Sequence, residues 1–219
     1  MFAQLQLDTQ AVFGAAGAKL LGTYELELVP AFNEVGTQSP AIVIDVGGAD
    51  GYYAVGFARI WQCQVIVFER LAQAREIIAR NSALNESDAA IELRGECDEA
   101  ELHALMQQQP RGGLLIMDIE GAELDLISER VAHSLDGWQV VIETHDFARP
   151  GCLAELERRL TPTHDVQRIV SRPREIADFP LLSPLSVALP AARKLELMDE
   201  QRPGAMTWLV GRPRGERSQ

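Results

Sequence analysis

Short apolar segments alternate with amphipathic ones through the middle of the chain. The apolar segments are rich in β-branched residues, which is typical of strands buried on both faces of a sheet. They lie at residues 41–46, 64–68, 113–119 and 138–143, with weaker candidates at 90–94, 164–170 and 206–210. The amphipathic segments have apolar residues at helical spacing and lie at 50–61, 71–84, 99–108, 122–135 and 153–160. Strands that alternate with helices in this way predict an α/β fold with a mostly parallel sheet and right-handed crossovers.

Two segments depart from this alternation. Residues 1–40 have a helical pattern that becomes extended and ends at Ser39-Pro40. Residues 172–205 contain five prolines, so they cannot form one regular helix or a central strand. Their leucines are too apolar for a free linker; these are Leu181, Leu182, Leu185 and Leu189. We predict a single domain over residues 1–219, with 1–40 as an N-terminal cap. We expect residues 172–205 to be an ordered insertion between the last two strands, which pair antiparallel at the edge.

Composition narrows the class of protein. The 219 residues are 47% hydrophobic and 24% charged, as in a soluble globular protein. The formal net charge of −12 argues against a broad nucleic-acid-binding face, which needs a basic patch. No apolar run approaches the roughly 18–20 residues that span a bilayer, and no signal-peptide pattern is visible. The three cysteines have no CxxC spacing and predict neither disulfides nor a thiolate metal site. We expect no nucleic-acid or membrane partner and a reducing cytoplasmic location.

A glycine-rich turn with acidic neighbours is the strongest motif. It runs Asp45-Val-Gly-Gly-Ala-Asp-Gly51, directly after a predicted strand and at the start of a predicted helix. Its glycines, at 47, 48 and 51, permit a tight turn and close approach of a ligand to the backbone. Glu69 ends the next strand, where a carboxylate can accept both hydroxyls of a ribose.

The charges around this turn favour one cofactor over another. Asp45 and Asp50 would repel the pyrophosphate of NAD(P), but they suit a cationic or zwitterionic ligand. S-adenosylmethionine has a sulfonium, an ammonium and a ribose, and it has no phosphate. The motif therefore predicts S-adenosylmethionine as the cofactor.

Three motifs together carry a resemblance to a known family. They are VIDVGGADGYYAVGFAR (43–59), VFER (67–70) and MDIEGAE (117–123). With them the chain resembles the class I S-adenosylmethionine-dependent methyltransferases, and more narrowly their FkbM-like group, over approximately residues 20–170. The resemblance implies a Rossmann-like seven-stranded sheet, mostly parallel with an antiparallel last strand, flanked by helices.

The resemblance also implies cofactor-binding roles at the strand ends and in the cap. The methionine part would bind to Asp45, Gly47, Gly48 and Gly51; the ribose to Glu69; the adenine beside Arg70, Glu96 and Cys97. Asp118 would lie where the fourth strand meets the active site. Tyr24 and Glu25 would fold over the cofactor, although an ordinary amphipathic strand is an equally good interpretation of that segment.

Polar clusters follow two strands that we expect to be adjacent. The fourth strand ends with Asp118 and Glu120, and the fifth with Glu143 and His145. These four are the candidate catalytic residues. Three interpretations stay open. Asp118, Glu143 and His145 bind Mg²⁺ or Mn²⁺, which lowers the pKa of a substrate hydroxyl; or His145 or Glu143 is a metal-free general base; or the cluster orders helix ends and loops, as an acid in a first helical turn such as Glu123 often does.

The predicted activity is methyl transfer from S-adenosylmethionine to a small molecule, a sugar or a natural-product intermediate. Oxygen is the favoured acceptor by family analogy. The alternatives are an NAD(P) oxidoreductase and a non-catalytic pseudo-enzyme that retains the cofactor fold. Substrate recognition would fall to residues 1–40 and 172–205, and the apolar 172–205 segment would cover the site, form a homodimer interface, or do both.

Overall fold

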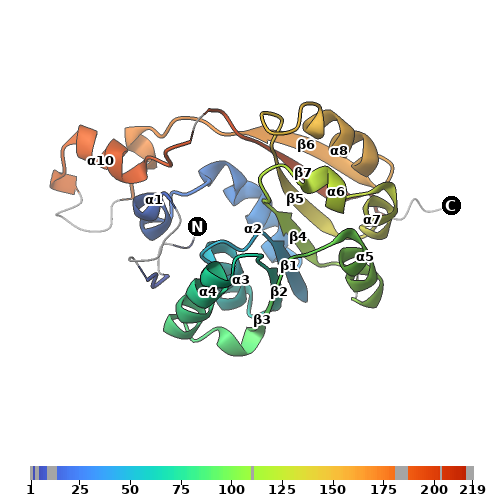
Figure 1. Ribbon diagram of the computed structural model, residues 1–219. Coiled ribbons are helices and arrows are strands. Elements are labelled where there is room, and N and C mark those ends of the chain that lie inside the picture. Colours follow the sequence, from blue (N-terminus) through green and yellow to red (C-terminus); the bar gives the residue numbers. More distant parts are fainter. Residues whose placement is uncertain are drawn as a thin grey trace.

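A seven-stranded mixed sheet forms the centre of the molecule (Figure 1). The structure is a computed structural model that describes residues 2, 5–8, 14–109, 111–180, 187–202 and 204–215. The strand order is β3-β2-β1-β4-β5-β7-β6. The strands are β1 (Ile42–Val46), β2 (Gln64–Phe68), β3 (Ile91–Arg94), β4 (Leu114–Met117), β5 (Gln139–Thr144), β6 (His164–Val170) and β7 (Thr207–Pro213). The first five are parallel, and β7 runs antiparallel to both β5 and β6. The predicted fold class is confirmed.

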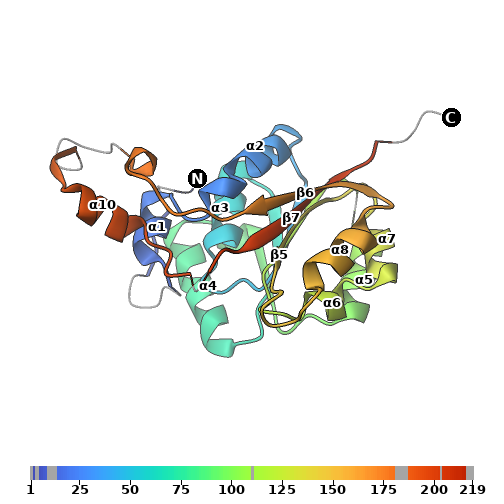
Figure 2. The ribbon, with the colours of Figure 1, turned by 90° about the horizontal axis from the view of Figure 1, so that it is seen from above.

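Helices cover both faces of this sheet because its strands are apolar on both sides. Alternate residues of β1 divide between two cores, with Val43 in one and Ile44 in the other. The first core is closed by α2 (Val29–Thr37) and α3 (Tyr52–Trp61), the second by α5 (Glu99–Gln108), α7 (Glu129–Ser134) and α8 (Cys152–Leu160). Figure 2 shows α2 and α8 on opposite sides of the strands. Helix α4 (Ala72–Leu84) adds Ile78 to the first core.

The helix predicted over 122–135 is two helices. Residues Glu123–Leu126 form α6, and α7 begins three residues after α6 ends, at Glu129. Ile127 leaves the helical conformation, and the Ser128 side chain accepts a hydrogen bond from the backbone N–H of Val131. A serine N-cap of this kind starts a new helix. The apolar spacing is continuous across the break, so periodicity alone does not reveal it.

The prediction that the second part of residues 1–40 is extended is wrong. After α1 (Ala16–Leu21) the chain forms a 3-10 turn, η1 (Leu26–Leu28), and then α2. Gly22 ends α1 in the left-handed conformation, and Glu25 has a φ of 47°. These two bends turn the chain back over the sheet, so Tyr24 and Glu25 do not form an amphipathic strand.

Residues 172–205 join β6 to β7 and contain η3 (Ile176–Asp178) and α10 (Ala191–Met198). Helix α10 lies beside α1, well away from the sheet (Figures 1 and 2). Gly17 permits this contact, because a Cβ there would lie 2.3 Å from the carbonyl oxygen of Leu197. The leucines at 181, 182 and 185 lie outside the described residues. Within the described part of the chain, no helix has the length and apolarity needed to cross a membrane.

Candidate active site

A pocket lies at the carboxyl ends of β1 and β4. The strand order reverses here, since β2 lies on one side of β1 and β4 on the other. Ligands of open α/β sheets bind at such a switch point. The lining comes from the glycine turn, the ends of β4 and β5, Trp208 of β7, and the N-terminal cap. Among the predicted cofactor residues, the pocket is lined by Tyr24, Glu25, Asp45, Gly47, Gly48 and Asp118.

The glycine turn is shaped by its neighbours in the sheet. Gly47 has a φ of 97°, and a Cβ there would lie 1.9 Å from the carbonyl oxygen of Asp118. A Cβ on Gly48 would lie 2.3 Å from Cγ1 of Val67. Gly51, also left-handed with a φ of 80°, is the N-cap of α3. Glycines 47 and 48 therefore let the turn pack against β4 and β2, which brings the backbone of the turn to the pocket wall.

Asp45 presents an unsatisfied carboxylate oxygen to this pocket. Its side chain is only 4% exposed, and Oδ2 has no hydrogen-bond partner among the described residues. Burial, together with the nearby charges of Asp118 and Glu69, raises the pKa of Asp45 to about 7. A buried polar atom without a partner costs free energy. A cationic ligand in the pocket would remove that cost.

Glu69 lies beside the turn with both carboxylate oxygens engaged. Oε2 accepts a hydrogen bond from the N–H of Ala49 at 3.0 Å, and Oε1 accepts one from the N–H of Leu71 at 2.8 Å. These contacts hold the carboxylate at the end of β2 while leaving lone pairs for ribose hydroxyls. Glu69 and Gly51 lie beside the pocket but are not among the residues that line it. The other predicted cofactor residues do not line it either: Arg70 and Glu96 are exposed, and Cys97 is buried in the second core.

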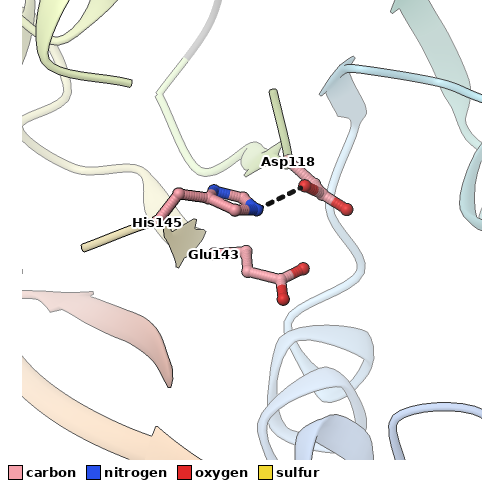
Figure 3. A group of neighbouring side chains, drawn as sticks. All are labelled: Asp118, Glu143 and His145. Atoms are coloured by element: carbon pink, nitrogen blue, oxygen red, sulfur yellow. Dashed lines mark ion pairs between the residues drawn. The ribbon is translucent and has the colours of Figure 1, made fainter. Parts of the chain in front are cut away.

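The side chains of Asp118, Glu143 and His145 lie close together (Figure 3), and the first two also line this pocket. Asp118 Oδ1 lies 3.5 Å from His145 Nε2, and one ligand atom from each of Asp118, Glu143 and His145 lies within 4.8 Å of the others. Glu120 adds an exposed carboxylate 3.5 Å from the same Nε2 atom. All four candidate catalytic residues line an adjoining hollow. The structure thus brings the two predicted strand-end clusters together.

Glu123 holds the imidazole of His145, a role that the sequence did not indicate. Its Oε1 lies 2.7 Å from His145 Nδ1 and accepts a hydrogen bond from the N–H of Gly121 at 3.0 Å. Glu123 is fully buried, whereas the Glu120 side chain is 79% exposed. Burial alone would raise the pKa of Glu123, but the hydrogen bonds from His145 and Gly121 lower it. The same contact, with the charge of Asp118, raises the pKa of His145 against the opposing effect of burial.

Arg202, from the 172–205 insertion, is a second residue that the sequence did not reveal. Its guanidinium binds Glu143 and Glu200 at 2.8 Å each, and it also binds Glu25. It lies 4.9 Å from the ring centre of Trp208. Burial, with the charges of Asp118 and Glu25 nearby, raises the pKa of Glu143, although the positive charge of Arg202 opposes this effect.

A second buried arginine extends this ion network. Arg174 binds both Glu27 of the cap and Glu200 of the insertion, and all three side chains are less than 10% exposed. The cap and the insertion, far apart in sequence, are therefore joined by buried charges beside the candidate catalytic residues. No local sequence pattern identifies the pairs between the cap and the insertion, because Arg202 and Glu25 are 177 positions apart and Arg174 and Glu27 are 147 positions apart.

Comparison with known proteins supports the assignment of the fold. No protein-family model and no curated protein sequence matches this chain. Solved structures do match. A precorrin-6y C5,15-methyltransferase from Geobacter metallireducens is 10% identical, with a TM-score of 0.58, and the match covers 96% of this chain and 95% of that one. The O-methyltransferase TomG from Streptomyces achromogenes, solved with SAM, is 10% identical, with a TM-score of 0.57 and coverage of 95% and 92%.

A third similar structure is an O-methyltransferase from Bacillus cereus solved with SAH. It is 11% identical, with a TM-score of 0.56 and coverage of 92% of this chain and 83% of that one. At such low identity these similarities establish a shared fold and nothing finer. The chain has the Rossmann-like seven-stranded fold of these methyltransferases.

Proposed function

We propose that this protein is an S-adenosylmethionine-dependent methyltransferase that acts on an oxygen of a small molecule. The observation that carries the proposal is the buried carboxylate oxygen of Asp45, which has no hydrogen-bond partner among the residues that the structure describes and lies at the switch point of the sheet beside a glycine turn. That environment favours a cation and disfavours a pyrophosphate. The similarity in fold to methyltransferases solved with SAM or SAH supports the same conclusion.

The residues of the pocket fit the parts of this cofactor. Asp45 and the backbone of the glycine turn would hold the methionine part, and Glu69, fixed by two backbone amides, would accept hydrogen bonds from the ribose hydroxyls. When bound, the cofactor supplies an electrophilic methyl group on a positively charged sulfur. Tyr24 and Glu25 line the same pocket from the cap, so they would exclude water from this end of the cofactor.

His145 is the group that we propose to take the proton of the acceptor. Glu123 binds Nδ1 and so turns Nε2 towards the rim, beside Asp118 and Glu120. In the transfer, the acceptor oxygen forms a bond to the methyl carbon, the carbon–sulfur bond breaks, and the hydroxyl proton passes to Nε2. A positioned base of this kind typically contributes about 10²–10⁴-fold in rate. Replacement of His145 by alanine should therefore lower turnover by more than about tenfold.

A second way of handling the proton is supported by the clustering of three ligand groups. Asp118, Glu143 and His145 form a set of two carboxylates and an imidazole within 4.8 Å, which fits Mg²⁺ or Mn²⁺. A cation bound there would lower the pKa of an acceptor hydroxyl. Thermal unfolding and turnover measured in EDTA and then with added MgCl₂ or MnCl₂ test this arrangement. If neither measurement changes, the metal-free histidine mechanism stands.

Calorimetric titration tests the proposal as a whole. We expect S-adenosylmethionine and S-adenosylhomocysteine to bind, and NAD⁺ and NADP⁺ not to bind. Binding of NAD(P)⁺ alone would replace the proposal with an oxidoreductase. Binding of S-adenosylmethionine without turnover in a broad acceptor screen would favour a non-catalytic protein. Narrower membership of the FkbM-like group stays a prediction from the motifs.

A further inference from the structure

Lys19 of α1 reaches into the proposed cofactor pocket. The sequence contains only two lysines, Lys19 and Lys194, among 20 basic residues. Lys19 is 4% exposed and lines the pocket. Its Nζ lies 2.6 Å from Oδ2 of Asp50 in the glycine turn and 5.1 Å from the ring centre of Tyr24. The ammonium group of a cap residue therefore contacts the same glycine turn that begins with Asp45.

The position of Lys19 is fixed by the packing of α1. Gly17 lets α1 contact the backbone of α10 at Leu197, and the left-handed Gly22 ends the helix three residues after Lys19. The backbone N–H groups of Thr23 and Tyr24 both donate to the carbonyl oxygen of Ala18. These contacts close the turn that follows α1, so the lysine is held over the glycine turn by the fold itself.

The charges of the pocket give this ammonium a particular use. The described residues that line the pocket include the carboxylates of Glu25, Asp45, Asp50, Asp118 and Glu143, and Lys19 is their only lining base. These acidic side chains suit the sulfonium and ammonium of S-adenosylmethionine, but none of them can attract its carboxylate. A zwitterionic amino-acid end needs a cation and an anion side by side, and the Lys19–Asp50 pair has that arrangement.

We propose that Lys19 and Asp50 form the binding site for the amino-acid end of the cofactor, with its carboxylate on Lys19 Nζ and its ammonium on Asp50. This inference rests on the proposed function and extends it to a residue outside the family-like motifs. Lys19 is then a residue that discriminates between adenosine thioethers with and without a zwitterionic end. It takes no part in the chemistry of methyl transfer.

A pair of ligands separates this role from a structural one. S-adenosylhomocysteine carries the amino-acid end, and 5′-methylthioadenosine has the same adenosine and thioether without it. Calorimetry should give the dissociation constants of both ligands for the wild type, Lys19→Met, Lys19→Arg and Lys194→Met. We expect Lys19→Met to weaken the binding of S-adenosylhomocysteine by about tenfold or more. It should weaken the binding of 5′-methylthioadenosine by less than about twofold. Lys19→Arg should recover part of the loss, and Lys194→Met should bind both ligands as the wild type does.

Three outcomes would overturn the inference. An equal loss of affinity for both ligands in Lys19→Met would mean that the Lys19–Asp50 pair is a purely structural contact. Unchanged affinity for both would mean that Lys19 does not contact the cofactor. Failure of the wild type to bind either ligand would instead overturn the proposed function, and this inference with it. If Lys19→Met does not fold, the double variant Lys19→Met/Asp50→Asn removes both buried charges. It should show the same selective loss of S-adenosylhomocysteine.

Discussion

Replacement of Asp45 by asparagine is expected to stabilise the ligand-free protein while weakening cofactor binding. The Asp45 carboxyl has a pKa of about 7 in the fold and 3.8 as its ordinary value, so the folded state holds this proton more tightly than the unfolded state. As the pH rises from about 4 through 7, the ionised form is increasingly disfavoured in the fold, and stability is lost. Above pH 7 the penalty is complete. Asparagine has the same shape and no charge, so its variant escapes this loss.

The size of the effect follows from the gap between the two pKa values. A gap of about three pH units corresponds to about 4 kcal/mol at most, since each unit is about 1.4 kcal/mol. At pH 5 only about a third of this penalty has developed. The advantage of Asp45→Asn over the wild type in free energy of unfolding should therefore grow by up to about 3 kcal/mol between pH 5 and pH 8. Other buried acids titrate in both proteins, so they cancel in the difference.

Urea denaturation followed by circular dichroism at both pH values measures this difference. Asp165→Asn is a matched control, because the Asp165 side chain is 76% exposed and pairs with Arg214 at the surface. Its effect should stay within about 0.5 kcal/mol at either pH. In the same preparations, S-adenosylhomocysteine should bind Asp45→Asn at least about tenfold more weakly than it binds the wild type. A stability difference that is equal at pH 5 and pH 8, or a variant less stable than the wild type at pH 8, would show that burial of the Asp45 charge does not destabilise the fold.

The remaining predictions concern groups around the pocket. Glu123→Gln should lower turnover by about 10–100-fold while leaving the affinity for S-adenosylhomocysteine unchanged, because it loosens His145 and touches no cofactor group; a matching loss of affinity would contradict this. Arg202→Met should cost about 3–5 kcal/mol in urea denaturation, since it leaves buried carboxylates unpaired, whereas Arg193→Met, on an exposed pair, should change stability little. Gly48→Ala should lower the melting temperature, since its Cβ has no room; an unchanged melting temperature would contradict the packing described for the turn.

The positions of the strands along the chain were largely predictable, because each strand depends on a local pattern of apolar residues. A strand buried on both faces needs an uninterrupted apolar segment, and β1, β2, β4 and β5 each have one. Where apolar spacing and a capping residue give opposite indications, the apolar pattern alone did not predict where a helix ends. Apolar spacing runs through residues 122–135, but the cap at Ser128 divides them into two helices. In the cap, left-handed residues at 22 and 25 replaced the predicted extended segment with a bend.

The glycine turn, its acids and the two polar strand ends could be located from the residues alone, because parallel strands present their carboxyl ends at one edge of a sheet. Which of these acids are buried depends on how the chain folds around them. Glu120 and Glu123 flank the same turn, yet one is exposed and the other holds His145. Only the tertiary structure brought Lys19 to Asp50 and Arg202 to Glu25 and Glu143. Each pair joins segments that are distant in sequence and that the fold brings together. Their energies arise from burial, a property of the folded molecule that no spacing along the chain encodes.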